Sequence, residues 1–128
     1  MSLEVIIGLP ASGKSYLCKK FEKKGYVVYD DFISNFYNNE LLNDDSEKIC
    51  IADPRLCNFE TFSRFIRYFE DRDIHLTLFE NNPQLCFINC ERRNTNIMKI
   101  KHSIEFLSKI YNLNNYNGNI TILPVYSD

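Results

Sequence analysis

Short runs of apolar residues are separated by longer stretches in which apolar positions recur at helical spacing. A continuous apolar run predicts a buried strand, because a strand in a parallel sheet is covered on both faces. Five strands are expected, at Leu3–Ile7, Tyr26–Tyr29, Ile49–Ala52, Ile74–Phe79 and Ile120–Val125. Pro124 marks the end of the last strand or its position at a sheet edge.

The intervening stretches predict helices, since their apolar residues lie three or four positions apart. The expected helices are Lys14–Lys24, Asp31–Asn39, Asn58–Asp71, Pro83 to about Arg93, and Ile97–Tyr111. Gly25 is a helix-stop residue, and Asn82 before Pro83 is typical of a helix start. Strands that alternate with helices predict an α/β fold with a mostly parallel sheet, in which ligands bind beyond the carboxyl ends of the strands.

Composition fits one folded domain spanning residues 1–128. The chain has 45% hydrophobic and 25% charged residues. No segment has the length and hydrophobicity of a membrane span, and the N-terminus lacks the pattern of a signal peptide. The net charge of −2 argues against a large, non-specific nucleic-acid surface, but it permits a small cleft for one strand end.

The five cysteines do not form a disulfide or zinc pattern. Their number is odd, their spacing is scattered, and no C-x-x-C occurs; they are Cys18, Cys50, Cys57, Cys86 and Cys90. We therefore expect free thiols with no disulfide partner, in a protein with a reducing, cytoplasmic location. The absence of a membrane-span pattern gives the further expectation of no membrane association.

The stretch from Gly8 to Ser15 reads GLPASGKS and matches the P-loop pattern G-x-x-x-x-G-K-[ST]. A strand precedes the motif and a helix follows it, as that loop requires. Gly8 and Gly13 permit backbone geometry that a side chain would hinder, so that the N–H groups from Ala11 through Ser12 to Ser15 can point at phosphate oxygens. Lys14 reaches the β- and γ-phosphates and the Ser15 hydroxyl holds Mg2+. The motif predicts a nucleoside triphosphate site, with ATP and Mg2+ as ligands.

Acidic residues follow the second and third strands. Asp30 and Asp31 come after the apolar run YVVY, and one carboxylate there can accept the proton of a substrate hydroxyl. We assign Asp30 as the base and Asp31 as a helix cap or a support for the acceptor. Asp53 ends the third strand, where it could hold Mg2+, contact the acceptor, or simply begin a turn before Pro54.

Two arginines, Arg92 and Arg93, end the helix that begins at Pro83. A mobile arginine can stabilise the charge of a transferring phosphoryl group and exclude water. From spacing alone, however, two surface arginines at a helix C-terminus are the simpler interpretation. Four further arginines are interpreted mostly as a solvated helix face: Arg55, Arg64, Arg67 and Arg72.

In combination, GLPASGKS, YDDF, ICIAD and LFENNPQLCFINCERR are similar in order and spacing to the kinase domain of phage-type polynucleotide 5′-hydroxyl kinases. The resemblance covers nearly the whole chain. It implies a three-layer P-loop NTPase fold with a five-stranded, adenylate-kinase-like sheet. It also implies transfer of the γ-phosphate of ATP to a 5′-hydroxyl end of DNA or RNA.

The resemblance also assigns roles to individual residues. Lys14 and Ser15 fall on its nucleotide and Mg2+ positions, and Asp30 on its general base. Arg93 falls on an arginine of a lid region at about 88–98. The remaining assignments are Arg92 beside the nucleotide, and Asp31, Asp53 and Arg55 in the acceptor cleft.

Two positions depart from that family, because Ile33 and Asn89 stand where it has arginines. These departures leave ATP binding intact and leave the acceptor open. The alternatives are a nucleic-acid 5′ end, a nucleotide, sugar or other small alcohol, and a non-catalytic module that binds ATP as a structural ligand. Asp30 together with Lys14 and Ser15 argues against the last.

Overall fold

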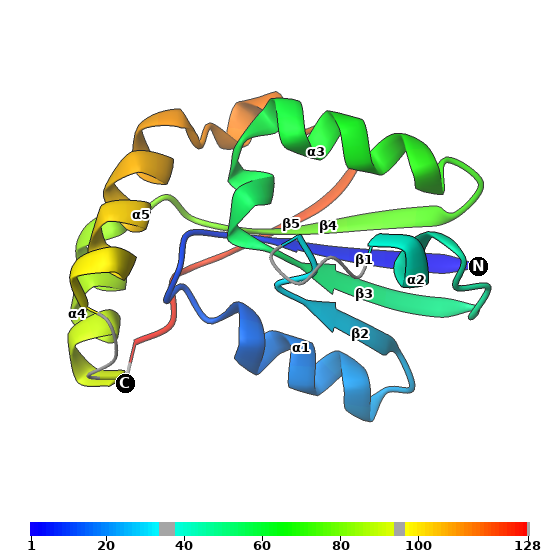
Figure 1. Cartoon of the computed structure of the whole chain (residues 1–128), viewed down its shortest axis with the longest axis horizontal. Helices are drawn as coiled ribbons and strands as arrows, with labels where there is room; N and C mark the ends of the chain where they lie inside the picture. The colour runs from blue at the N-terminus through cyan, green and yellow to red at the C-terminus, as the bar shows by residue number, and fades with distance from the viewer. Residues whose placement is uncertain (34–37, 94–96, 128) are drawn as a thin grey trace.

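A five-stranded parallel sheet forms the centre of the computed structural model, which describes residues 1–33, 38–93 and 97–127 (Figure 1). Its strands are β1 (Ser2–Ile7), β2 (Val27–Asp30), β3 (Lys48–Ala52), β4 (Asp73–Phe79) and β5 (Asn119–Leu123). They lie in the order β2-β3-β1-β4-β5, and every neighbouring pair is parallel. The predicted α/β class and the five-stranded sheet are confirmed. β5 lies at an edge, as Pro124 indicated.

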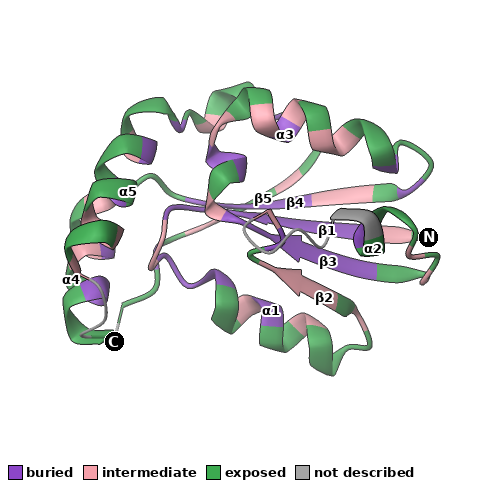
Figure 2. Ribbon diagram, in the orientation of Figure 1, coloured by how far each residue is buried: buried purple, intermediate pink, exposed green. Residues whose placement is uncertain are grey.

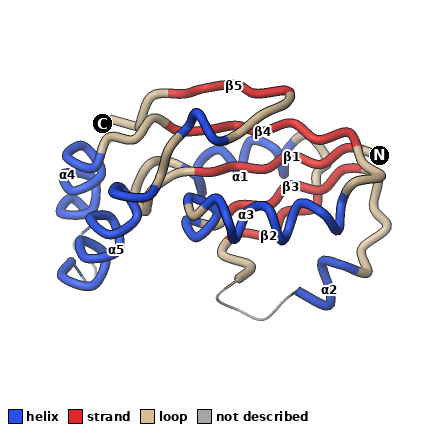
Figure 3. The backbone as a smooth tube through the Cα atoms, turned by 90° about the horizontal axis from the view of Figure 1, so that it is seen from above, coloured by secondary structure: helices blue, strands red, loops and turns tan. Residues whose placement is uncertain are grey.

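Helices cover both faces of the sheet and extend beyond one end of it. They are α1 (Lys14–Lys23), α2 (Asn38–Leu42), α3 (Phe59–Ile66), α4 (Pro83–Arg93) and α5 (Ile97–Ile110), with 3-10 turns η1 (Pro54–Cys57), η2 (Arg67–Phe69) and η3 (Leu113–Asn115). Figure 1 shows α1 on one face of the sheet and α3 on the other. In Figures 1 and 3, α4 and α5 lie beyond the carboxyl ends of the strands, where a ligand site is expected. No helix in the described ranges is both long and apolar enough to cross a membrane.

The central strands carry the core because both of their faces are covered. In β1, Leu3, Val5 and Ile7 are at most 1% exposed and point to the α3 side, where they meet β3 and β4 residues. Ile6 points to the other face and packs in a smaller cluster with α1. Figure 2 shows this burial concentrated in β1 and β3. The apolar runs of the sequence therefore mark the sheet correctly.

A polar network interrupts the apolar face under α1. Glu4 in β1 is 4% exposed and accepts hydrogen bonds from Thr77 Oγ1 (2.5 Å) and His75 Nδ1 (2.6 Å). His75 Nε2 lies 2.8 Å from Thr121 Oγ1 on β5. A buried carboxylate needs such partners, because an unpaired one is costly to remove from water.

Two expectations about helices are wrong. Asp31 has φ 53° and its N–H bonds Ala52 O, so residues 31–33 form a turn and not the start of a helix. Residues 34–37 of that predicted helix lie outside the described residues. The Asn58–Asp71 helix ends at Ile66 and continues as the η2 turn.

Arg72 was expected on a solvated face, but it is only 8% exposed. Its guanidinium donates to Ser2 O (3.3 Å) and Asp44 O (3.1 Å). These carbonyls come from segments distant in sequence, so Arg72 joins them at the amino ends of the strands.

Candidate active site

The loop between β1 and α1 has the backbone that its glycines permit. Ala11 and Gly13 lie in the left-handed region, with φ 65° and 114°. A Cβ on Gly8 would lie 2.5 Å from Ser12 Oγ, and one on Gly13 would lie 3.0 Å from Tyr126 Cβ. Close contacts therefore require glycine at both positions, and at Gly13 the backbone conformation requires it as well.

Lys14 is folded against its own loop. Its side chain is buried, and Nζ donates to Leu9 O at 2.6 Å. Burial lowers the pKa of Lys14, while the nearby carboxylates of Asp30 and Asp31 act in the opposite direction. The ammonium group is thus held, largely desolvated, beside the loop that the motif assigns to phosphates.

A cleft of about 240 Å³ opens at the carboxyl ends of the strands. Among the residues that line it are six predicted from the sequence: Ala11, Lys14, Ser15, Asp30, Asp31 and Arg93. Cys90 and Ile100 contribute an apolar wall from α4 and α5. The fold therefore brings the P-loop, the tip of β2 and the end of α4 to one cavity.

Ser15 and Asp30 are in direct contact across this cleft. Ser15 Oγ donates to Asp30 Oδ2 at 2.7 Å. The contact places the predicted Mg2+ ligand and the predicted base within one hydrogen bond of each other.

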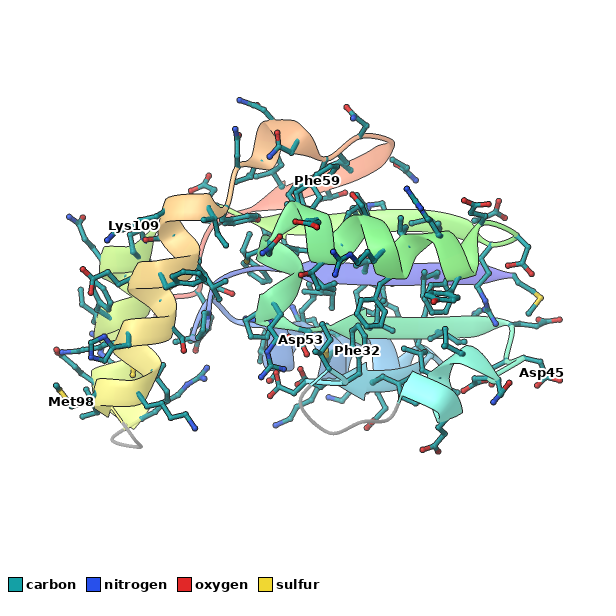
Figure 4. All side chains as sticks on the ribbon, turned by 45° about the horizontal axis from the view of Figure 1, so that its top comes forward. Phe32, Asp45, Asp53, Phe59, Met98 and Lys109 are labelled. Atoms are coloured by element: carbon teal, nitrogen blue, oxygen red, sulfur yellow. The ribbon has the colours of Figure 1, made fainter. Side chains whose placement is uncertain are left out.

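The other two acidic residues have different surroundings. Burial, together with the neighbouring Asp30 and Asp53 carboxylates, raises the pKa of Asp31. Asp53 is fully buried and accepts from Ile33 N (3.0 Å) and Arg55 N (2.9 Å), so both of its oxygens are engaged by the backbone. Burial raises the pKa of Asp53 despite these bonds. Figure 4 labels Asp53 at the end of β3, next to Phe32. This geometry favours the turn-residue interpretation of Asp53, and its Mg2+ or acceptor role stays a prediction.

The arginines separate into two positions. Arg93 lines the cleft beside the P-loop, whereas Arg92, one residue earlier on α4, is exposed and does not line it. Arg55 is exposed and lines a neighbouring cleft of about 310 Å³ between η1 and α5, together with Ser103 and Phe106. Residues 94–96 of the predicted lid region lie outside the described residues. The acceptor role of Arg55 and the nucleotide role of Arg92 stay predictions.

Asn89 and Tyr126 lie next to the site, although neither was predicted as a site residue. Asn89 on α4 donates to Ala11 O and to Tyr126 O, and Tyr126 N donates to Ser12 O. The available signal was an amide on the apolar face of α4, between Cys86 and Cys90. Ile33, the other departure from the kinase pattern, packs against the hydrophobic core.

The residues at this site fit a triphosphate with Mg2+. Gly8 and Gly13 leave the loop free of side-chain atoms that would crowd it, and α1 begins at Lys14 with its N-terminus toward the loop. Within the described part of the chain, no three His, Cys, Asp or Glu side chains are grouped to hold a metal. Mg2+ is usually held by one or two protein oxygens together with phosphate oxygens and water. The Ser15 hydroxyl, which lines the cleft, offers such an oxygen.

No protein-family model matches the sequence. The fold itself matches a solved structure, a gluconokinase from Sinorhizobium meliloti 1021, with a TM-score of 0.71. The match covers 99% of this chain and 84% of that one at 11% sequence identity. At that identity the match shows the fold alone, which this chain shares with that gluconokinase.

Sequence similarity identifies a family for this chain. The chain is 40% identical over 123 residues to the uncharacterized protein R277 of Acanthamoeba polyphaga mimivirus. The match covers 90% of this chain and 89% of that protein. The chain belongs to the same family as R277.

Proposed function

We propose that this protein is an ATP-dependent kinase that transfers the γ-phosphoryl group to a hydroxyl acceptor. The observation that carries the proposal is the single cleft lined by Lys14, Ser15, Asp30 and Arg93. A binding module needs only the first two of these residues. A carboxylate and an arginine at the same cavity supply what phosphoryl transfer requires in addition.

Each side chain has a defined task in this proposal. Lys14 exchanges its hydrogen bond to Leu9 O for one to a phosphate oxygen. Because the phosphate is anionic, its attraction offsets the free-energy cost of desolvating the ammonium group. Asp30 releases the Ser15 hydroxyl and accepts the proton of the acceptor hydroxyl. Arg93 balances the charge on the transferring group and helps to keep water away from it. ATP supplies the phosphoryl group, and Mg2+ neutralises part of its charge.

For the acceptor we propose the 5′-hydroxyl end of a nucleic acid. The order of the P-loop, YDDF, ICIAD and CERR motifs supports this choice. A small alcohol is the second candidate, and two observations favour it. Ile33, which packs against the core, and Asn89, which is buried, do not supply the positive charge that an arginine would give at these positions. In addition, the structural match is a gluconokinase. The cytoplasmic location is part of the same proposal, and the five free, buried cysteines are compatible with it.

The decisive experiment incubates the protein with γ-labelled ATP, Mg2+ and a panel of 5′-hydroxyl oligonucleotides, nucleosides and small sugars. Label on oligonucleotides supports the first acceptor, and label only on small alcohols supports the second. Triphosphate binding with no transfer to any acceptor would instead indicate a binding module.

Asp30→Asn tests the base, with Asp31→Asn as the matched control one residue away. Asp30→Asn should lower transfer about 10²–10⁴-fold while ATP still binds, as for loss of a general base. Asp31→Asn, at the predicted acceptor position, should raise the KM for the acceptor more than it lowers kcat. Equal losses in both variants would contradict the assignment of Asp30.

A further inference from the structure

Asn89 is a buried polar side chain in the otherwise largely apolar interior face of α4. It is 5% exposed, and its Nδ2 donates to Ala11 O at 3.0 Å and to Tyr126 O at 2.6 Å. Because both partners are carbonyl oxygens, the amide can face them only with its NH2 group. Its Oδ1 is buried and has no hydrogen-bond partner among the described residues. An amide kept in such an incompletely satisfied position calls for a reason beyond packing.

The two bonds join three separate segments of the chain. Ala11 lies in the P-loop, Asn89 on α4, and Tyr126 in the segment that follows β5. Tyr126 N also donates to Ser12 O at 2.9 Å, so this segment contacts the P-loop directly as well as through Asn89. Figures 1 and 3 both show the end of the chain beside α4. Asn89 is thus the point at which the P-loop, α4 and the C-terminal segment are tied together.

The contact at Ala11 bears directly on phosphate binding. Ala11 has φ 65°, a left-handed conformation that a residue with a Cβ adopts only at a cost in free energy. Asn89 holds the carbonyl oxygen of this residue on the α4 side. A carbonyl turned into the loop would present negative charge to a phosphate, whereas a carbonyl held outside leaves the N–H groups to face it.

The contact also concerns Arg93, which lies four residues after Asn89 on the same helix and lines the cleft. A rigid helix moves these two residues together, because they are about one turn apart. The same side chain therefore links the P-loop to the helix that carries the arginine.

We propose that Asn89 is a positioning residue for the triphosphate. It holds the P-loop in its phosphate-binding conformation and sets α4, with Arg93, against that loop. This inference rests on the proposed nucleotide site. Asn89 itself does not line the cleft.

The test is Asn89→Asp, which keeps the size of the side chain but turns both donors into a carboxylate that faces two carbonyls. The expected result is an ATP dissociation constant about tenfold or more weaker, comparable to the loss of one or two hydrogen bonds. In the nucleotide-free protein, amide hydrogen exchange should accelerate over Ala11–Ser15 and at Tyr126.

Asn81→Asp is the matched control. Asn81 Nδ2 likewise donates to two carbonyls, Ser108 O (2.9 Å) and Tyr111 O (3.0 Å), but these do not belong to the P-loop. This variant should lower the melting temperature without changing ATP affinity or exchange in the P-loop. An Asn89→Asp protein with wild-type affinity and exchange, or an equal loss of affinity in both variants, would overturn the proposal.

Two further arms keep the outcome decisive. If Asn89→Asp does not fold, Asn89→Ala is measured in its place, since it removes the donors without adding a charge. Lys14→Ala reports on the nucleotide site alone. If the wild-type protein binds no triphosphate, the proposed function fails, and the exchange rates of the nucleotide-free P-loop still decide whether Asn89 positions it.

Discussion

Replacing Lys14 with methionine is expected to make the nucleotide-free protein more stable while abolishing triphosphate binding. Lys14 is 7% exposed, and among the described residues its ammonium group donates one hydrogen bond, to Leu9 O. Methionine has a similar length, so it can occupy the same space without a charge. Function and stability therefore make opposite demands on this side chain.

The size of the effect follows from three contributions. Removing an ammonium group from water costs several kcal/mol, and methionine avoids that cost. Against it stand about 1 kcal/mol for the bond to Leu9 O and about 1 kcal/mol or less for the attraction to Asp30 and Asp31 at the open cleft. The net gain is about 1–3 kcal/mol, which corresponds to a rise of roughly 4–12 °C in melting temperature for a chain of this size.

The pH dependence gives an independent check. Burial lowers the pKa of Lys14 below its ordinary value of 10.5, so the folded state disfavours the charged form. This destabilisation is complete below the folded-state pKa and disappears as pH rises from there toward 10.5. The advantage of Lys14→Met should therefore be largest near neutral pH and should shrink in alkaline buffer.

Thermal unfolding of both proteins between pH 6 and 10, together with ATP-binding titrations, measures these expectations. Lys19→Met is the control, because Lys19 is exposed on the same helix; it should change neither stability nor binding appreciably. A Lys14→Met protein that is less stable than wild type at pH 7, or a stability difference that is constant with pH, would refute the reasoning.

Two further predictions concern Gly8 and Asp53. Gly8→Ala places a Cβ 2.5 Å from Ser12 Oγ; it should lower the free energy of unfolding by about 1–3 kcal/mol and should abolish ATP binding. The control Gly25→Ala meets no atom within 4 Å; it should lower the free energy of unfolding by about 1 kcal/mol through backbone strain and should bind ATP normally. Chemical denaturation and ATP titration compare the two variants, and equal ATP binding by both would contradict the prediction. Asp53→Asn turns an NH2 group toward a backbone N–H and should cost about 1–3 kcal/mol of stability. The Mg2+ concentration needed for half-maximal activity should remain that of the wild type. A tenfold higher Mg2+ requirement in Asp53→Asn would instead assign Asp53 to the metal.

Local patterns made much of this protein predictable. The apolar runs located all five strands within a few residues, because a strand buried on both faces must be apolar nearly throughout. The P-loop was also predictable, since its chemistry is carried by consecutive residues between a strand and a helix. Asp30 was identified by its place at the end of a strand, whereas Arg93 was assigned by the resemblance to polynucleotide kinases, because its spacing alone favoured a surface arginine. The structure brings both to the P-loop cleft.

The errors arose where a group forms a hydrogen bond with a residue far away in the sequence. Residues 31–33 carry a pattern compatible with a helix, yet the N–H of Ile33 bonds a carboxylate twenty positions away, on Asp53. Arg72 lies in a polar stretch of the sequence, but its side chain is buried and donates hydrogen bonds to two carbonyls from other segments. Patterns within one segment contain no information about such partners.

The sequence by itself determined the strands, the phosphate loop and the kinds of chemical group available beside it, because these depend on neighbours in the chain. Only the tertiary structure decided which acidic residue faces the cleft and which is consumed by backbone N–H groups. It also showed Asn89 as the link between the P-loop and the helix of Arg93. The physical reason is that burial and hydrogen-bond partners are set by the packing of segments far apart in sequence, and these determine whether a polar side chain is available for chemistry or occupied in holding the fold.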